Sequence, residues 1–406
     1  MDLRYTAEYD AFRAEVRAFL EASWPLKGSE AALPEGERER IFRDRAIEAG
    51  YLYRGVPKRY GGSERPTDIL ESTIILDEFS RAGAPSELQG QGPTMLVPTL
   101  LEKGNEAQRE KFIRPTILGE MVWAQGYSEP GAGSDLASLK TRAELDGDEW
   151  VINGQKIWTS GAQQADMMFC LVRTEPDAGK HAGISYLLVD MKSPGIRVRT
   201  LKQMTGSEDF CEVFFDDART PAENIVGERG EGWAVSRATL MHERALIGSS
   251  DRIEAMFEAL VKLAREAQID GRPAIEHAHV RQQLAEIQGY VATQTWSGKR
   301  MLTATARGEF AGIVMMMAKI NSTNIGHRAA RLALDLIGDG ALAVPNDAPY
   351  SPVDDGTRAS WLGNWMWSLG IAIAGGTANI QRNIIAERGL GLPREPAANL
   401  HAGAKR

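Results

Sequence analysis

Residues 123–161 decide the fold of this chain. They begin WAQGYSEPGAGSDLASLKT and end VINGQKIWTSG. Short apolar and β-prone runs alternate in this stretch with small and polar residues, which is typical of strands joined by tight turns. The residues GAG at 131–133 form a loop in which backbone N–H groups can approach a phosphate or a ring closely. The loop lacks the Gly-Lys-Ser/Thr element of a Walker motif, and it does not open a helix as a GxGxxG turn does.

The same alternation continues to residue 215 and predicts a small β-domain. Asp146-Gly147 and Asn153-Gly154 are strong hairpin turns, because Asp-Gly and Asn-Gly accept positive φ values. A series of short strands over about 100 residues favours a small barrel or a sandwich. We expect strands at 123–128, 141–145, 149–152, 156–160, 167–173, 184–190, 196–201 and 211–215.

Helical periodicity lies on both sides of this β-domain. Before residue 120, amphipathic segments have helix-end residues, such as Gly50 after 37–49 and Asn105 before 108–118. The predicted fold is therefore α+β: a helical N-terminal domain (1–120), a central β-barrel-like domain (121–225) and a C-terminal four-helix bundle domain (226–406). The helices of the bundle are expected at 231–269, 275–307, 310–338 and 362–389, and the polar loop at 338–360 is long enough to have a functional role.

Composition excludes several classes of protein. The chain has 406 residues, 43% of them hydrophobic, and a formal net charge of −8, so it can bury a large core and has no basic character for nucleic-acid binding. Its two cysteines are too few for a disulfide framework or a zinc site. The His277 and His279 pair has no cluster of metal spacing around it, so no metal is expected. No apolar run approaches the ~18 residues of a membrane span and no signal peptide is evident, so we expect a cytoplasmic protein without membrane contact.

Two motifs point to a family. SEPGAGSD, followed about 20 residues later by NGQKIWTS, resembles the β-domain signature of the acyl-CoA dehydrogenase family. Near the C-terminus, IAGGTANIQRNIIAERGLGLPRE (373–395) resembles the final motif of the same family: a Gly-Thr turn, a helix with Ile-Gln-Arg, then Leu-Pro-Arg. The resemblance covers roughly residues 5–395, in the family's order of helical, β and helical domains.

The resemblance implies a bound FAD and assigns residues to it. Residues 125–134 match the family's flavin-binding strand and loop, residues 158–160 match a segment packed on another edge of the flavin, and residues 376–379 match a turn that holds the dinucleotide part. The residues so assigned are Gln125, Tyr127, Ser128, Gly133, Ser134, Trp158, Thr159, Ser160, Gly376, Thr377 and Asn379. Ser134 also matches a position that touches the pantetheine arm of the CoA thioester. A Trp beside hydroxyl residues can itself cover an aromatic cofactor and bind its edge.

The catalytic base is expected on the helix at 231–269. The family's reaction removes a proton from the carbon α to a thioester, so a carboxylate must lie over that carbon. Many members carry a Glu immediately before the Gly-Thr of the final motif, where this chain has Gly375. The isovaleryl and long-chain branches carry the base on a bundle helix, in an element ending Glu-Arg. Glu243 and Arg244 match that element, which implies Glu243 as the base and Arg244 as a contact of CoA.

Two family elements that concern the neighbouring subunit are altered here. Members often have an Arg before a Phe-Gly that meets the FAD pyrophosphate across a subunit boundary. This chain has no such Phe-Gly. Arg265 and Arg281 are the candidates to replace the Arg, and we expect Arg281 to bind the cofactor. A Gln before a Gly-Gly turn is replaced by Asp335, whose charge would repel FAD phosphates if it faced them. Because the FAD tail in this family reaches a neighbouring subunit, we expect a homodimer or a homotetramer.

The predicted function is FAD-dependent α,β-dehydrogenation of an acyl-CoA thioester to the trans-2-enoyl-CoA, with electrons passed to an electron-transfer flavoprotein. One alternative is a flavin-dependent monooxygenase of the same fold, some of which use a His and lack the Glu. His242 lies about 100° around the helix from Glu243, so both cannot face one ligand. A further alternative is a non-catalytic partner subunit of a hetero-oligomeric acyl-CoA dehydrogenase. The sequence does not give the acyl chain.

Overall fold

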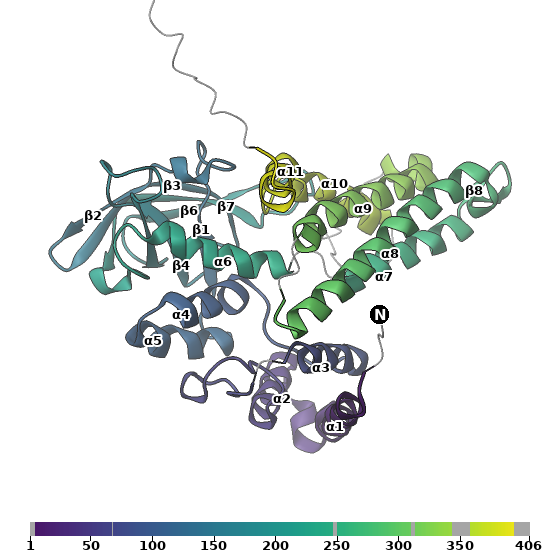
Figure 1. The fold of residues 1–406 in the computed structure, drawn as a ribbon, viewed down its shortest axis with the longest axis horizontal. Helices are drawn as coiled ribbons and strands as arrows, with labels where there is room; N and C mark the ends of the chain where they lie inside the picture. The colour runs from purple at the N-terminus through teal and green to yellow at the C-terminus, as the bar shows by residue number, and fades with distance from the viewer. Residues whose placement is uncertain (1–4, 67, 247–249, 310–312, 343–357, 394–406) are drawn as a thin grey trace, which may run out of the picture. The chain divides into compact units, whose positions relative to one another are not determined.

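The computed structural model describes residues 5–66, 68–246, 250–309, 313–342 and 358–393. The chain forms two compact units, Met1–Leu246 and Ile247–Arg406. The predicted α+β order of helices, a β-domain and helices is confirmed (Figure 1). The subdivision at residues 120 and 225 stays a prediction. In the described part of the chain, no helix is both long and apolar enough to cross a membrane.

Two of the N-terminal helices have the end residues that their sequence predicts. Helix α2 (Glu35–Ala49) is followed by Gly50, which has φ +90°, a left-handed conformation that favours glycine. Asn105 caps helix α5 (Glu106–Ile117), and Gln108 completes a reciprocal capping box. Phe42 and Phe79 pack with their ring centroids 5.8 Å apart in the core between the helices. The helices are α1 (Ala7–Ser23), α2 (Glu35–Ala49), α3 (Ile69–Ala82), α4 (Val97–Lys103) and α5 (Glu106–Ile117).

The β-domain is a curled, mixed sheet of seven strands (Figure 1). The strands are β1 (Trp123–Gly126), β2 (Arg142–Asp146), β3 (Glu149–Ser160), β4 (Met167–Arg173), β5 (Ile184–Asp190), β6 (Ile196–Leu201) and β7 (Phe210–Pro221). Their order is β1-β4-β2-β3-β7-β6, and β5 pairs with β4. Pairing is antiparallel except where β4 runs parallel to β1 and, at Arg173, to β2. The predicted bounds of β4, β5 and β6 are confirmed residue for residue.

One predicted turn is correct and another is wrong. Asp146 pairs with Glu149, so the turn at Asp146-Gly147 does join β2 to β3. At Asn153-Gly154 the chain does not turn back, and the two strands expected at 149–152 and 156–160 are the single strand β3. A shift in the pairing with β7 occurs there instead, which is a β-bulge. Gly154 is required because a Cβ at this position would lie 2.6 Å from the Cα of Thr141.

Helix α6 (Gly232–Leu246) belongs to the first unit. It packs against β5 and α4, and Thr239 on this helix is completely buried. The region expected to form one helix at 231–269 contains α6 and α7 (Ser250–Glu266). Residues 247–249, between them, lie outside the described residues.

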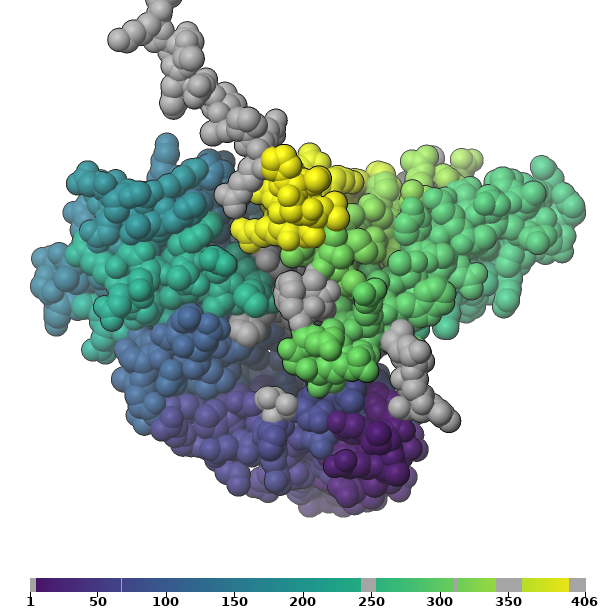
Figure 2. Space-filling view, in the orientation of Figure 1, coloured from purple at the N-terminus to yellow at the C-terminus, as the bar shows by residue number. Residues whose placement is uncertain are grey.

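The second unit is helical, as predicted for a bundle. Helices α7, α8 (Ala278–Ala306) and α9 (Ile313–Ile337) pack against one another, and α10 (Arg358–Ile371) packs on α9. The prediction of a single helix at 362–389 is wrong. Helix α10 ends at Ile371, and α11 (Ala378–Ile384) begins after a turn that contains two glycines of positive φ. A small hairpin, β8 (Gln268–Ile269) and β9 (Arg272–Pro273), was not predicted. Figure 2 shows the surfaces of these helices from green to yellow. Most of the loop at 338–360 lies outside the described residues.

Candidate functional site

The predicted strand and loop at 125–134 runs from the sheet to the surface of the first unit. Gln125 is half-buried in β1, opposite Phe169 of β4. Tyr127 is buried, and its ring packs edge-on against Phe169 at 5.9 Å and against Tyr186 at 6.3 Å between ring centroids. Ser128 is half-buried, and its carbonyl accepts a hydrogen bond of 2.9 Å from the N–H of Ile157. This bond joins the 125–134 segment to the segment that contains Trp158.

The loop that follows is open on one side. Glu129 and Ala132 exchange two backbone hydrogen bonds of 2.9 and 3.0 Å, which close a tight turn. Gly133 and Ser134 lie beyond this turn and are exposed. A Cβ added at Gly133 would meet no atom within 4 Å. The backbone at Gly133 is therefore uncovered on that side.

The segment at Trp158–Ser160 is strained and has an unpaired polar group. A register shift between Lys156 and Thr159 places Trp158 at φ +60°, where bulky residues are rare. Trp158 is 59% exposed as a residue, and its ring contacts Phe210 edge-on. Thr159 is completely buried, and within the described residues its Oγ1 has no hydrogen-bond partner. Ser160 is half-buried at the end of β3.

These features fit a planar cofactor with a polar edge. A buried hydroxyl without a partner is costly and points to a ligand that satisfies it. Strained backbone at an exposed aromatic residue is typical of a ligand-binding position. Thr159 and Trp158 meet these two descriptions, and the Ser128–Ile157 bond holds the open loop beside them.

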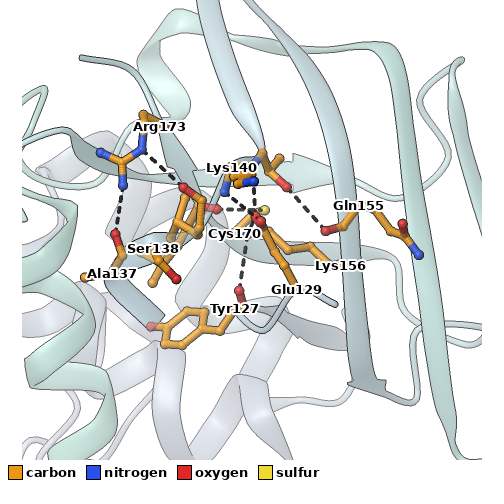
Figure 3. A network of polar contacts seen from close by, with 12 residues as sticks. Tyr127, Glu129, Ala137, Ser138, Lys140, Gln155, Lys156, Cys170 and Arg173 are labelled. Carbon is orange, nitrogen blue, oxygen red and sulfur yellow. Dashed lines mark hydrogen bonds and ion pairs between the residues drawn. The ribbon is translucent and has the colours of Figure 1, made fainter. Parts of the chain in front are cut away.

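A buried ion pair that the sequence analysis missed lies beneath this surface (Figure 3). Lys156 Nζ lies 2.8 Å from Oε1 of Glu129 and also donates to the carbonyl of Tyr127. Burial by itself raises the pKa of Glu129, but the charge of Lys156 and the hydrogen bonds to this carboxylate outweigh it and lower the pKa. Glu129 lies in the motif SEPGAGSD and Lys156 in the motif NGQKIWTS, and neither motif by itself indicates that the two side chains pair. Burial raises the pKa of the neighbouring Cys170 thiol to about 11, so this cysteine is not a nucleophile.

Helix α6 carries the predicted base. Glu243 lies one turn after Thr239 in this helix, and the side chains of Glu243 and Arg244 lie outside the described part of the structure. The Thr239 hydroxyl lies 3.4 Å from the hydroxyl of Tyr186, whose ring packs on Tyr127. The helix is thus anchored beside β5 and the Tyr127 segment of the same unit.

In the second unit, the turn before α11 is held by side chains. Gly376 has φ +89°, and Thr377 caps α11 by accepting from the N–H of Ile380 at 3.3 Å. Lys319 Nζ donates to the carbonyl of Gly376 at 2.9 Å, and Gln381 donates to that of Gly375 at 3.0 Å. Hydrogen bonds from two other side chains and from the cap of α11 thus hold the backbone of this turn.

The other residues assigned in this unit lie on its helices. Asn379 lies in the first turn of α11, directly after the turn that Thr377 caps, and its side chain accepts a hydrogen bond of 3.2 Å from Arg382. Arg281 is exposed on α8, and among the described residues no hydrogen bond or ion pair links its side chain to the turn. Asp335 pairs with Arg331 at 3.4 Å. In the described residues no group of His, Cys, Asp and Glu could hold a metal ion.

Three family models match the chain in order. They are the acyl-CoA dehydrogenase N-terminal domain at residues 6–120, the middle domain at 124–218 and the C-terminal domain at 230–390. The chain therefore belongs to the acyl-CoA dehydrogenase family, a family of flavoprotein oxidoreductases, and the predicted family and enzyme class are confirmed.

The similarity to particular relatives covers nearly the whole chain. Acyl-CoA dehydrogenase IpdE1 of Mycobacterium tuberculosis (strain ATCC 25618 / H37Rv) is 38% identical over 406 residues, which cover 96% of this chain and 99% of that protein. A chain of the ChsE4-ChsE5 complex from Mycobacterium tuberculosis matches with a TM-score of 0.74 and 31% identity, over 97% of this chain and 100% of that chain. A structure described as the Tcur3481-Tcur3483 steroid ACAD gives the same TM-score, identity and coverage.

Proposed function

We propose that this protein catalyses FAD-dependent α,β-dehydrogenation of an acyl-CoA thioester to the trans-2-enoyl-CoA. The observation that carries the proposal is the unpaired, buried hydroxyl of Thr159 beside the strained Trp158. Both residues lie in the segment that the family uses for its flavin, and the Ser128–Ile157 hydrogen bond holds the second flavin segment next to them. FAD supplies, when bound, the acceptor for the two electrons that leave the substrate.

The residues of this chain have separable tasks in that reaction. Tyr127, Ser128, Trp158, Thr159 and Ser160 would hold the cofactor, with Gly133 and Ser134 at the open loop toward the pantetheine arm. Gly376, Thr377 and Asn379 would hold the dinucleotide part. Glu243 would take the proton from the α-carbon, because Gly375 has no side chain to do so. Arg244 would contact the CoA.

The acyl group that we propose is a ring-bearing one derived from a steroid. The support is the Tcur3481-Tcur3483 steroid ACAD, which matches nearly the whole chain. A panel of CoA thioesters with straight-chain, branched and steroid-derived acyl groups tests this point. Faster anaerobic reduction by a straight-chain thioester than by every steroid-derived one would contradict it.

A heteromeric assembly is the second candidate, and a specific observation favours it. Two structural relatives each carry two subunit names, ChsE4-ChsE5 and Tcur3481-Tcur3483. In such an assembly this chain would contribute FAD contacts while a partner chain supplies the base. Light scattering of the purified protein distinguishes the cases: a homodimer or homotetramer that holds FAD supports the first, and a monomer that binds FAD only with a second chain supports the other.

One experiment tests the proposed reaction directly. The FAD-loaded protein is mixed without oxygen with acyl-CoA, and the visible absorption of oxidised FAD is followed. Bleaching on addition of an acyl-CoA, with formation of the enoyl-CoA, supports the dehydrogenase. Reoxidation by an electron-transfer flavoprotein but only slowly by O₂ separates it from a monooxygenase. Failure of the whole acyl-CoA panel to bleach bound FAD contradicts the proposal.

A further inference from the structure

The carboxylate of Glu129 is the point where three segments of the first unit meet. It accepts hydrogen bonds from the backbone N–H of Lys140 at 2.6 Å and of Thr141 at 2.9 Å, in addition to the ion pair with Lys156 (Figure 3). The side chain of Lys156 is fully buried and that of Glu129 is 7% exposed. Charges this deeply buried are tolerated only with their hydrogen bonds in place, so this arrangement has little freedom to shift.

Both ends of the exposed loop at Gly133 and Ser134 are bonded to Glu129, the first by its backbone and the second by its carboxylate. Its first end is the backbone turn between Glu129 and Ala132, and its second end reaches residues 140–141, which Glu129 itself binds. Arg173 holds the return path by donating to the carbonyls of Ala137 at 2.9 Å and Leu139 at 3.2 Å (Figure 3). Glu129 therefore ties the two ends of the loop to each other.

Lys156 fixes the opposite segment. It is the last residue before the bulge that turns Trp158 to φ +60° and buries the unpaired hydroxyl of Thr159. Its Nζ also donates to the carbonyl of Tyr127 at 3.2 Å. A small movement of Lys156 would thus move Trp158 relative to the loop.

We propose that Glu129 and Lys156 are positioning residues of the FAD site. Their ion pair sets the spacing between the loop at 131–134 and the segment Trp158–Ser160, and that spacing determines how tightly FAD binds. This role rests on the proposed function, since it concerns the same cofactor. The competing explanation is that the pair only stabilises the β-domain.

Titration of FAD into the apoprotein distinguishes the two roles. Glu129→Gln keeps the shape of the side chain and removes its charge, while Lys156→Arg keeps the charge and changes the geometry. The matched control is Glu78→Gln, because Glu78 is also a buried carboxylate and pairs with Arg13 and Arg17 between α1 and α3. For each variant, the dissociation constant for FAD, the visible absorption of bound FAD and the melting temperature are measured.

We expect Glu129→Gln to weaken FAD binding about tenfold or more, by analogy with metal sites, where loss of an outer-shell partner typically costs about 10- to 100-fold in affinity. We also expect both variants of the pair to shift the visible absorption bands of bound FAD. Glu78→Gln should lower the melting temperature but keep the FAD affinity within about twofold and the spectrum unchanged.

Two results overturn the proposal in distinguishable ways. If the wild-type protein binds FAD and is bleached by acyl-CoA, but Glu129→Gln and Lys156→Arg keep its affinity and spectrum, then the pair is merely structural. If the wild-type protein binds no FAD in the same titration, the proposed function fails and this role fails with it.

Discussion

The ammonium group of Lys319, buried inside the second unit, lies 2.9 Å from the backbone carbonyl oxygen of Gly376. A second hydrogen bond of 3.4 Å runs from the same group to the carbonyl of Ala372. Both acceptors are neutral, so the lysine charge is solvated by backbone dipoles at the turn that precedes α11. Burial accordingly lowers the pKa of Lys319.

The first prediction concerns how Lys319 affects the free energy of unfolding of the protein at alkaline pH. The pKa of a lysine in the unfolded chain is about 10.4, above that of buried Lys319, so the unfolded state binds more protons in the interval between the two values. The free energy of unfolding of the wild type should therefore rise relative to that of Lys319→Met as the pH increases toward 10. Urea unfolding at a series of pH values measures this difference.

The matched control for that measurement is Lys262→Met, because Lys262 is exposed on α7 of the same unit. The difference in the free energy of unfolding between Lys262→Met and the wild type should stay constant over the same pH range. A constant difference for Lys319→Met as well would contradict the assigned environment of Lys319.

The second prediction concerns Glu129 at acidic pH. Because its pKa is lowered in the folded state, its contribution to stability is complete above the unfolded value of about 4.3 and is lost as the pH falls through the lower folded value. We expect Glu129→Gln to cost about 3 kcal/mol of unfolding free energy near pH 7, because it leaves Lys156 buried without its counter-charge.

Denaturant unfolding should show that this cost shrinks below about pH 4, because the wild type then loses the stability that the ionised carboxylate of Glu129 provides. The exposed Glu110→Gln on α5 serves as the control and should change stability by less than about 0.5 kcal/mol. A cost for Glu129→Gln that is equal at pH 7 and pH 3 would show that the charge of Glu129 does not contribute.

The third prediction separates binding from stability at Trp158. Trp158→Gly removes an exposed ring and relieves a positive φ that costs a non-glycine residue about 1–2 kcal/mol. It also loses the edge-on contact with Phe210, worth about 0.5–1.5 kcal/mol. The two effects nearly cancel, so the unfolding free energy should change by less than about 1 kcal/mol, while FAD retention falls.

Gel filtration followed by the ratio of flavin to protein absorbance measures that retention. Trp296→Gly is the comparison, because Trp296 is also an exposed tryptophan but lies on a regular helix, α8. It should lose stability, since glycine is unfavourable in a helix, and keep FAD. Full FAD occupancy in Trp158→Gly would remove Trp158 from the cofactor site.

The sequence predicts most of this fold because many of its strands and helix ends are determined by residues that are close together in the sequence. The strands β4, β5 and β6 are short apolar runs between turns, and the capping residues at Gly50 and Asn105 act within one helical turn. The turn predicted at Asn153-Gly154 failed because the decisive contact is distant in the sequence: Gly154 passes close to Thr141 while the strand continues. A dipeptide preference contains no information about that neighbour.

For the candidate site, too, the sequence indicates local segments but not the contacts between residues that are distant in the sequence. The motifs name the segments at 125–134 and 158–160, and the hydrogen bond between Ser128 and Ile157 joins the first segment to the residue just before the second. Their role in holding FAD stays a prediction. Neither the positive φ of Trp158 nor the pairing of Glu129 with Lys156 can be derived from residue type, because both depend on how β3 pairs with β7 and with the loop. The role of Glu243 stays a prediction.

The fourth prediction concerns that role. The α-proton of a thioester is too weakly acidic to leave unaided, and Gly375 offers no side chain where many family members have a Glu. Helix α6 carries Glu243 one turn after Thr239, whose hydroxyl lies 3.4 Å from Tyr186 beside the proposed FAD segment. Glu243→Gln should therefore bind FAD and acyl-CoA as the wild type does, but reduce FAD about 10² to 10⁴ times more slowly, the usual loss for a general base.

Anaerobic stopped-flow absorbance with the acyl-CoA that bleaches the wild type fastest measures this rate. Glu110→Gln, an exposed carboxylate on α5 of the same unit, is the control and should keep the wild-type rate. His242→Ala in the same experiment tests the neighbouring residue. A near wild-type rate for Glu243→Gln would exclude Glu243 as the base. A loss in His242→Ala would then assign the proton to His242, and wild-type rates in both variants would place the base on a partner subunit.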